Sequence, residues 1–338
     1  MNILAVESSC DETAVAIVRD GRQVLTDCIA SQVELHRMYG GVVPEIASRM
    51  HIEAIYALAD QALEKAGLTR TDIDAVAVTY APGLIGAVLV GVNFAKAAAL
   101  AMNKPLIPVH HIRGHIAANY IAYPELKPPF LCVVVSGGHT MIVDVKDYTQ
   151  MEILGTTLDD AAGECFDKVG RVLGMPYPGG AALDRAAQQG DDTKYELPRS
   201  RPGANPYDMS FSGLKTATLN LIHHAEQIGE ELDINSLCAS FTAAVSDTLV
   251  PRVIQALQQT GRKQLAVAGG VAANSRIRKD SLESAEKLGV SVCLPPINLC
   301  GDNAAMIGAQ AYYEYLSGNV ADMSLNAYAT KSILGETL

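Results

Sequence analysis

The sequence predicts an α/β fold made of two lobes that share a ligand cleft. At 338 residues the chain is long for a single core, and its apolar content of 49% is enough to fill two. Short apolar runs alternate with helix-length segments, and the strand, polar turn and strand that begin the chain return after residue 129. We therefore expect duplicated lobes over residues 1–127 and 128–302, with a C-terminal helix and tail, 303–338, packing back on the first.

The first half predicts an antiparallel edge on a parallel sheet. Asn2–Glu7 is apolar enough for a buried strand, and Asp20-Gly21 suits a hairpin turn. Pro44 fits the first position of a helix and Gly67 the position after its last turn, so we expect a helix between them. The other expected elements are strands Ala14–Arg19, Gln23–Ser31, Ala75–Thr79 and Leu106–Val109 and helix Leu84–Met102.

The second half begins as the first does. Strand Phe130–Val135 leads through the small-residue turn Ser136–His139 into strand Thr140–Lys146, as the first strand leads through Ser8–Thr13. Two later strands are expected at Gln264–Ala268 and Ser291–Leu294. The expected helices are Ala161–Leu173, Ala181–Gln189, Ile234–Gln259, Asn274–Leu288 and Asp302–Tyr315.

Charge and cysteine content narrow the class of protein. The net charge of −11 gives no global attraction for nucleic acid, so an RNA contact needs a local basic patch or a partner. The seven cysteines are scattered, and no two have Cys-x-x-Cys spacing, which favours free thiols in a reducing cytoplasm. The N-terminus starts a strand and shows no export signal, so we expect a cytoplasmic protein with no membrane contact.

A pair of histidines is the strongest candidate for a metal site. On a helix, His111 and His115 project from one face about 6 Å apart at Cβ, which suits two imidazoles binding one ion. Two surface or core histidines are the alternative interpretation. The usual zinc peptidase motif needs Glu directly after the first His, and Ile112 stands there, which argues against that class.

Two small-residue turns are candidates for binding an anion or a nucleotide. The backbone N–H groups of Ser136-Gly137-Gly138 are unhindered and suit a phosphate or carboxylate, although an ordinary tight hairpin has the same composition. After the turn at Gly269, Asn274 can cap a helix or offer its amide to a ribose. Between residues 194 and 215, basic and aromatic residues alternate, which suits either single-stranded RNA or a solvated loop.

Together these motifs resemble, essentially end to end, the bacterial TsaD (Gcp) family within the actin, Hsp70 and sugar-kinase superfamily (ASKHA). The matching segments are Glu7–Thr13, Gly40–Glu45, Pro82–Leu84, His110–His115, Ser136–Thr140, Asp159–Glu164, Tyr177–Gly180, Ser210–Lys215, Gly269–Asn274 and Asp302-Asn303. The resemblance implies transfer of a threonylcarbamoyl group from threonylcarbamoyl-AMP to N6 of the adenosine beside the anticodon, in tRNAs that read codons starting with A.

The resemblance also implies a metal ion and a set of substrate contacts. One iron ion per subunit, with zinc as the alternative, is expected on His111, His115 and Asp302. The residues expected to contact the substrate are Val134, Val135, Ser136, Gly137, Gly138, Asp167, Gly180, Asp184 and Asn274. Relatives work with the shorter paralogue TsaB, as a heterodimer, and with the ATPase TsaE. Some relatives carry a Tyr ligand where Val134 stands here, so three protein ligands are expected to leave open positions on the metal.

Catalytic roles and rival functions complete the hypothesis. Asp11 and Glu12 in the first turn are the candidates for accepting or orienting the amine proton. An ASKHA-type ATPase or small-molecule kinase is the main rival, because phosphate turns do not distinguish ATP from an acyl-adenylate. The histidines argue against it, since a kinase using Mg²⁺ wants oxygen ligands. A non-catalytic scaffold would not need the metal residues and both small-residue turns.

Overall fold

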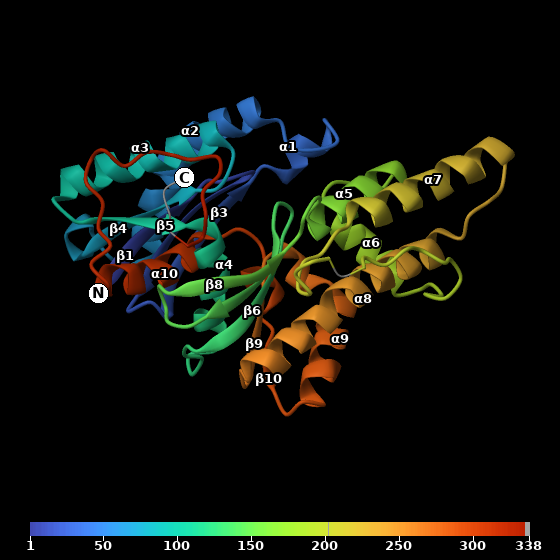
Figure 1. The fold of residues 1–338 in the computed structure, drawn as a ribbon. Coiled ribbons are helices and arrows are strands. Elements are labelled where there is room, and N and C mark those ends of the chain that lie inside the picture. The colour runs from blue at the N-terminus through green and yellow to red at the C-terminus, as the bar shows by residue number, and fades with distance from the viewer. Residues whose placement is uncertain (202, 335–338) are drawn as a thin grey trace. The chain divides into compact units, whose positions relative to one another are not determined.

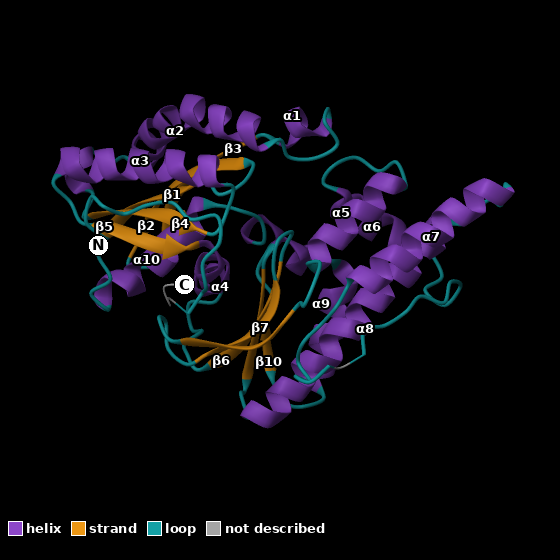
Figure 2. Cartoon of the chain, turned by 45° about the horizontal axis from the view of Figure 1, so that its top comes forward, coloured by secondary structure: helices purple, strands orange, loops and turns teal. Residues whose placement is uncertain are grey.

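The computed structural model describes residues 1–201 and 203–334. These residues divide into two compact units. Unit 1 comprises Met1–Pro128, Lys146–Met151 and the described residues from Pro295 onward, and unit 2 comprises Pro129–Val145 and Glu152–Leu294. Each unit is an α/β body in which helices cover a sheet (Figures 1 and 2).

The units differ from the lobes predicted from the sequence in two segments. Lys146–Met151 groups with unit 1 because Tyr148 stacks on Tyr313, with ring centroids 3.7 Å apart, and accepts a hydrogen bond from Arg22. Residues 295–302 also group with unit 1, so Asp302 is part of the unit that contains the histidines. The last four residues of the predicted tail, 335–338, lie outside the described residues.

Within the described residues, unit 1 is built on a five-stranded sheet of order β3-β2-β1-β4-β5. Its strands are β1 (Asn2–Glu7), β2 (Glu12–Arg19), β3 (Gln23–Ser31), β4 (Ala75–Ala81) and β5 (Leu106–His110). β2 pairs antiparallel with both β1 and β3, whereas β4 pairs parallel with both β1 and β5. The predicted antiparallel edge on a parallel sheet is therefore confirmed.

Helices cover both faces of this sheet, and strand alternation decides which side chains each face receives. The helices are α1 (Val33–Arg37), α2 (Pro44–Ala66), α3 (Ile85–Met102), α4 (His111–Ala122) and α10 (Ala304–Leu316). Leu4 and Val6 of β1 belong to the core formed with α2 and α3, whereas Ile3 and Ala5 belong to the core formed with α4 and α10. By the same period of two, Glu7 at the end of β1 lies on the side of α4 and α10.

The sheet of unit 2 has the same topology. In the described residues its order is β10-β9-β6-β7-β8, which is the order of unit 1 read from the other edge. Its strands are β6 (Phe130–Val135), β7 (Thr140–Val145), β8 (Met151–Thr156), β9 (Gln264–Ala268) and β10 (Ser291–Cys293). β6 pairs antiparallel with β7 and parallel with β9, just as β1 pairs with β2 and β4. The duplication predicted from two similar hairpins is therefore present in the topology.

Five helices of unit 2 position its candidate residues. They are α5 (Ala162–Val172), α6 (Gly179–Ala187), α7 (Ser212–Ile228), α8 (Ile234–Thr260) and α9 (Ser275–Glu286). α6, α8 and α9 pack in succession, and α5 packs against α6 and α7. The sequence analysis predicted neither α7 nor β8, and it also missed the short α1.

Two described helices, α3 and α8, are long and apolar enough to cross a membrane by length and composition. Buried core helices pass the same test, and 83% of the apolar window in α8 is buried inside the protein. In α3 only 33% of the window is buried, because one side packs on the sheet and the other is exposed. The exposed side is considered below as a partner surface.

Candidate metal centre and substrate-binding residues

The two histidines are placed by a direct change from strand to helix. β5 ends at His110 and α4 begins at His111 with no loop between them. The Nδ1 of His110 caps the helix by accepting a hydrogen bond from the Ile112 N–H at 3.3 Å. One turn apart on α4, the rings of His111 and His115 meet edge to face, with centroids 4.6 Å apart. The predicted shared face of a helix is confirmed.

Asp302 joins these histidines from a segment almost two hundred residues further along the chain. Its Oδ1 lies 3.2 Å from His115 Nε2 and 3.5 Å from His111 Nε2. One possible ligand atom from each of the three residues lies within 4.8 Å of the other two. His111 is 8% exposed and His115 only 1%. Two imidazoles and one carboxylate directed at one point fit a transition-metal ion such as iron or zinc.

Glu7 lies behind His111, on the side away from Asp302. The His111 Nδ1 is 3.0 Å from Glu7 Oε2, and Thr79 Oγ1 donates to the same oxygen at 2.6 Å. Burial opposes charge on His111, but Asp302 and Glu7 outweigh it and raise the pKa of His111 to about 9. Burial also raises the pKa of Glu7, but its attraction to His111 is stronger, so the net pKa is lowered. Metal-free His111 therefore carries a proton that bound metal must displace.

The first turn of unit 1 brings together the two predicted catalytic carboxyls. Asp11 is buried, and Glu12 is half-buried and accepts a hydrogen bond from Ser31 Oγ at 3.1 Å. Burial, followed by the charges of Asp11 and Asp302, raises the pKa of Glu12 to about 9. Burial also raises the pKa of the neighbouring Cys10 thiol, which is hydrogen-bonded to Asp11. At neutral pH Glu12 holds its proton, so Asp11 is the better candidate for a proton acceptor.

The raised pKa of Glu12 predicts a stability effect that depends on pH. Above pH 4.5 the unfolded chain loses the Glu12 proton, whereas the folded chain keeps it until about pH 9, so folding must take up a proton in that window. We expect Glu12→Gln to raise the free energy of unfolding of the metal-free protein by roughly 1–3 kcal/mol at pH 8, and by little at pH 5. Urea unfolding in a chelating buffer measures both values. An equal change at the two pH values would contradict the assignment.

The turn between β6 and β7 has the open backbone expected of an anion site. The Ser136 N–H donates to the His139 carbonyl at 2.8 Å, and the Ser136 carbonyl accepts from the Gly163 N–H at 3.2 Å. A side chain at Gly163 would place its Cβ 2.5 Å from that carbonyl, so only glycine allows α5 to approach the turn. Within residues 1–201 and 203–334, no protein acceptor bonds the N–H of Gly137 or Gly138. These exposed donors suit a phosphate or carboxylate.

The other predicted substrate contacts in unit 2 are already buried or hydrogen-bonded within the protein, which limits the groups that they can offer to a substrate. Val134 and Val135 are fully buried, and β6 is paired there with β7 and β9, so neither residue presents a side chain to a ligand. Asp167 on α5 accepts a hydrogen bond from the Gly180 N–H at 3.2 Å. This bond links two of the residues predicted to contact the substrate. Asn274 Oδ1 caps α9 by accepting from the Ile277 N–H at 3.0 Å, so the capping role of Asn274 is observed.

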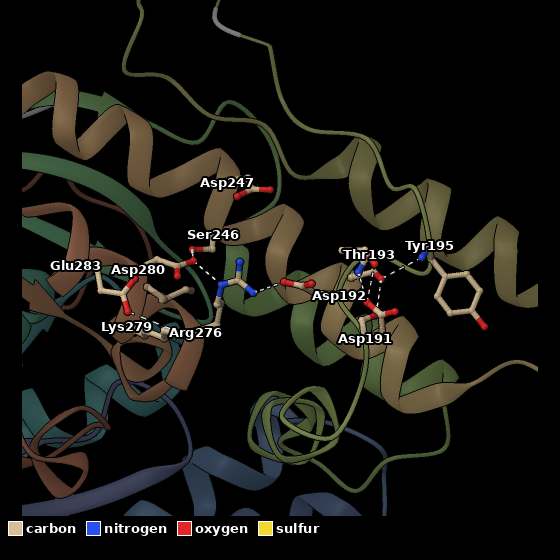
Figure 3. A network of polar contacts seen from close by, with 12 residues as sticks. Asp191, Asp192, Thr193, Tyr195, Ser246, Asp247, Arg276, Lys279, Asp280 and Glu283 are labelled. Atoms are coloured by element: carbon tan, nitrogen blue, oxygen red, sulfur yellow. Dashed lines mark hydrogen bonds and ion pairs between the residues drawn. The ribbon is translucent and has the colours of Figure 1, made fainter.

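Asp184 holds the same end of α9. Its Oδ1 accepts hydrogen bonds from both the N–H and the hydroxyl of Ser275, at 3.1 and 2.8 Å. One residue further, Arg276 donates to Asp192 at 2.5 Å and to Asp280 at 2.6 Å, as Figure 3 shows. The start of α9, with Asn274, is therefore fixed from two sides. Asp167, Gly180, Asp184 and Asn274 all lie in unit 2, where α5, α6 and α9 supply them.

The basic stretch of unit 2 has less free charge than its sequence indicates. Lys194 pairs with Asp233 at 3.0 Å and Arg199 with Asp247 at 3.0 Å. Lys215 pairs with Asp160, and Phe211 is fully buried. Most of the cations are neutralised and an aromatic ring is removed from the surface, which weakens the RNA-binding interpretation of this stretch.

The sequence analysis missed Glu7 as part of the metal centre. It assigned Glu7 only to a buried strand, although an acidic residue that ends an apolar run and faces a helix is costly unless paired. The pattern of alternation in β1 carried this signal, because Glu7 follows Ile3 and Ala5 on one face. Its partner His111 is 104 residues away, so the pairing itself could not be read from the sequence.

Comparison with known proteins identifies the same family along the chain. The family model described as TsaD, tRNA N6-adenosine threonylcarbamoyltransferase, matches residues 23–309. A tRNA N6-adenosine threonylcarbamoyltransferase of Clostridium botulinum is 52% identical over 327 residues, which is 97% of this chain and 96% of that protein. The enzyme of the same name from Moorella thermoacetica is 54% identical over 326 residues, covering 96% and 95%.

Solved structures show the fold independently of sequence. HypF of T. kodakarensis superposes with a TM-score of 0.63 at 15% identity, over 96% of this chain and 49% of HypF. Component A of the (R)-2-hydroxyglutaryl-CoA dehydratase of Acidaminococcus fermentans superposes with a TM-score of 0.53 at 15% identity, over 94% and 99%. These similarities confirm the predicted actin, Hsp70 and sugar-kinase type of fold, and at this identity they carry no statement about activity.

Proposed function

The chain belongs to the TsaD family of tRNA N6-adenosine threonylcarbamoyltransferases, and we propose that it takes the threonylcarbamoyl group from threonylcarbamoyl-AMP. The observation that carries the transferase activity is the identity of 52% across 97% of the chain with enzymes of that name. In the reaction the N6 amine of a tRNA adenosine attacks the carbamoyl carbonyl. A new C–N bond forms, the bond to the AMP phosphate oxygen breaks, and the amine loses a proton.

We assign one iron ion, with zinc as the alternative, to His111, His115 and Asp302. The convergence of both Nε2 atoms on one carboxylate oxygen supports this assignment. When bound, the ion supplies Lewis-acid polarisation of the carbamoyl carbonyl. Three protein ligands leave coordination positions for substrate oxygens, which is the arrangement of catalytic rather than structural sites.

We assign the nucleotide part of the donor to residues of unit 2. The free N–H groups of Gly137 and Gly138 suit the phosphate of the adenylate, beside the backbone of Val134, Val135 and Ser136. Asp167, Gly180, Asp184 and Asn274 are assigned to the adenosine and ribose. The described hydrogen bonds occupy one oxygen each of Asp167 and Asn274, and a carboxylate or amide can make further bonds.

A direct assay separates this proposal from its rival, a kinase or ATPase of the same fold. The purified protein, with TsaB and TsaE, is given threonylcarbamoyl-AMP labelled in the threonyl group and unmodified tRNA. We expect label in tRNA that depends on an adenosine beside the anticodon. Phosphorylation of a small acceptor from ATP, without transfer of label to tRNA, would support the kinase instead.

The outer face of α2 and α3 is our candidate surface for TsaB. Ile52 and Tyr56 on α2 are 64% and 60% exposed, and Ile85 and Leu89 on α3 are 53% and 40% exposed. The two helices lie side by side over the sheet of unit 1 (Figure 1). A cluster of large exposed apolar side chains on neighbouring helices is typical of a protein interface. A paralogue that presents similar helices could bury them in a shared bundle.

Substituting the centre of this face should weaken the heterodimer. We expect Tyr56→Lys to raise the dissociation constant for TsaB by about tenfold or more, because an interface tyrosine is often a hot spot and a buried lysine is costly. Isothermal titration calorimetry measures the constant. Ile297→Lys is the matched control, since Ile297 is 72% exposed in unit 1 but is not part of α2 or α3. Equal weakening by both substitutions would argue against this surface.

We place the reaction in the cytoplasm, where its tRNA substrate is found. In the described residues none of the seven cysteines forms a disulfide, which is expected of a protein in a reducing compartment. TsaE is assigned as the second partner by the family resemblance alone.

A further inference from the structure

Glu7 is a fully buried carboxylate whose place in the chemistry has not been assigned above. We propose that Glu7 is a positioning residue that fixes His111 in the tautomer whose Nε2 can bind the metal. The inference rests on the proposed metal site. It concerns a residue of β1 that acts through His111, and it predicts an effect on metal affinity that is separate from catalysis.

The hydrogen bonds of Glu7 fix its orientation. Oε1 accepts from the Ser9 N–H at 2.6 Å, whereas Oε2 accepts from Thr79 Oγ1 at 2.6 Å and lies 3.0 Å from His111 Nδ1. The side chain of Glu7 is 0% exposed, so no solvent competes for it. Held between two strands and one helix, the carboxylate presents one oxygen to His111 in a fixed direction.

This geometry decides which nitrogen of His111 carries the proton. An ionised carboxylate only accepts hydrogen bonds, so Nδ1 of His111 must donate to it. In neutral His111 the lone pair is then on Nε2, the atom 3.5 Å from Asp302. A carboxylate behind a metal-binding histidine has this effect in many metal sites and also makes the imidazole a stronger ligand.

His115 provides an internal comparison. Its Nδ1 is buried, and in the described part of the chain it has no hydrogen-bond partner. The two ligands are therefore unequal at Nδ1, since a carboxylate bonds the Nδ1 of His111 and no described residue bonds the Nδ1 of His115. An effect of Glu7 on metal binding should consequently pass through His111 and be independent of His115.

Glu7→Gln keeps the shape of the side chain and reverses the hydrogen bond to His111. The Ser9 N–H requires an acceptor, which places the amide oxygen of Gln there and the amide NH₂ towards Thr79 and His111. The Nδ1 of His111 then faces this NH₂ and the Ser9 hydroxyl, which lies 3.2 Å away and can also donate. The Nδ1 accepts from these donors, and the proton moves to Nε2, where it faces the metal. Metal can bind only after the proton returns to Nδ1. That change brings the N–H of His111 against the NH₂ of the new amide, so two donors face each other and binding is weakened.

The experiment measures the zinc affinity of the full chain by competition with a chelating dye, in three backgrounds. We expect Glu7→Gln to weaken zinc binding about 10- to 100-fold in the wild type. In a His115→Ala background the same factor should remain, whereas in a His111→Ala background it should disappear. Asp144→Asn is the control, because Asp144 is a buried carboxylate of unit 2 paired with Arg262.

The outcomes separate the inference from the metal site itself. If the His111→Ala and His115→Ala proteins both bind zinc as tightly as the wild type, the proposed metal site is wrong. If both do and Glu7→Gln does not, the site stands and the positioning role is wrong. An equal loss from Glu7→Gln in both histidine backgrounds would indicate a general loss of structure and would also overturn the role. Near-UV circular dichroism of Glu7→Gln and Asp144→Asn compares their folding.

Discussion

Replacing both His111 and His115 by alanine is expected to remove the bound metal and to lower the rate of threonylcarbamoyl transfer by about 10³-fold or more. In the proposed site the two imidazoles supply two of the three ligands, and Asp302 alone cannot retain a transition metal. Lewis-acid stabilisation of several kcal/mol is lost with the ion, and each 1.4 kcal/mol corresponds to about a factor of ten in rate. Transfer of labelled threonylcarbamoyl to tRNA, with TsaB and TsaE present, gives the rate, and elemental analysis gives the metal content.

The chain offers a matched control for this double substitution. His223 and His224 are exposed on α7, in unit 2, so replacing both by alanine removes the same number of imidazoles without touching the metal centre. We expect full metal content and nearly full transfer in that control. A His111→Ala, His115→Ala protein that transfers the group at the normal rate would remove the metal from the mechanism.

Unit 1 was predictable from sequence because its signals are local. The apolar runs of β1 and β2 each lie within one strand, and the proline that begins α2 and the glycine that follows its last turn mark one helix. Gly67 adopts a left-handed conformation with φ 64°, as expected at the end of a helix. β1, β2 and β4 are buried on both faces, as expected of inner strands of a sheet that helices cover on both sides.

The elements that were missed have weak local patterns. β8 (Met151–Thr156) is an edge strand with mostly half-buried residues, so it lacks the continuous apolar run that marks a central strand. α7 begins at Ser212 with no capping hydrogen bond from its own N-cap residue. Instead, Asp159 accepts hydrogen bonds from the N–H groups of Phe211 and Ser212, and that partner is about fifty residues away. Such a distant cap leaves no start signal in the neighbouring sequence.

The candidate site shows the same division. The spacing of His111 and His115 predicted a shared helix face without further information, but spacing gave no reason to choose Asp302 among the many acidic residues. That residue came from the family resemblance, and the structure brings it to within 3.2 Å of His115. Neither the spacing nor the family resemblance predicted the role of Glu7. That role depends on a contact between the end of β1 and the start of α4, which are 104 residues apart.

Asp11→Asn is expected to lower the rate constant of transfer by about 10²- to 10⁴-fold while leaving metal binding unchanged. Asn keeps the size of Asp11 and can accept hydrogen bonds from Cys10 and Glu12, but it cannot take the proton that the attacking amine must lose. Asp11 is 6% exposed, so water cannot easily replace the carboxylate. Single-turnover transfer at saturating tRNA measures the chemical step apart from binding.

Glu12→Gln is the informative comparison, because Glu12 is the other carboxyl of the same turn. With the pKa of Glu12 raised to about 9, the group is already neutral at pH 7, and an amide resembles the state that the enzyme uses. A rate near that of the wild type is therefore expected for Glu12→Gln at pH 7. If Glu12→Gln is inactive and Asp11→Asn is active, the roles are reversed, and Glu12 is the proton acceptor. The pH dependence of the rate then distinguishes the two assignments, since an acceptor with a pKa near 9 would make transfer rise steadily between pH 7 and 9.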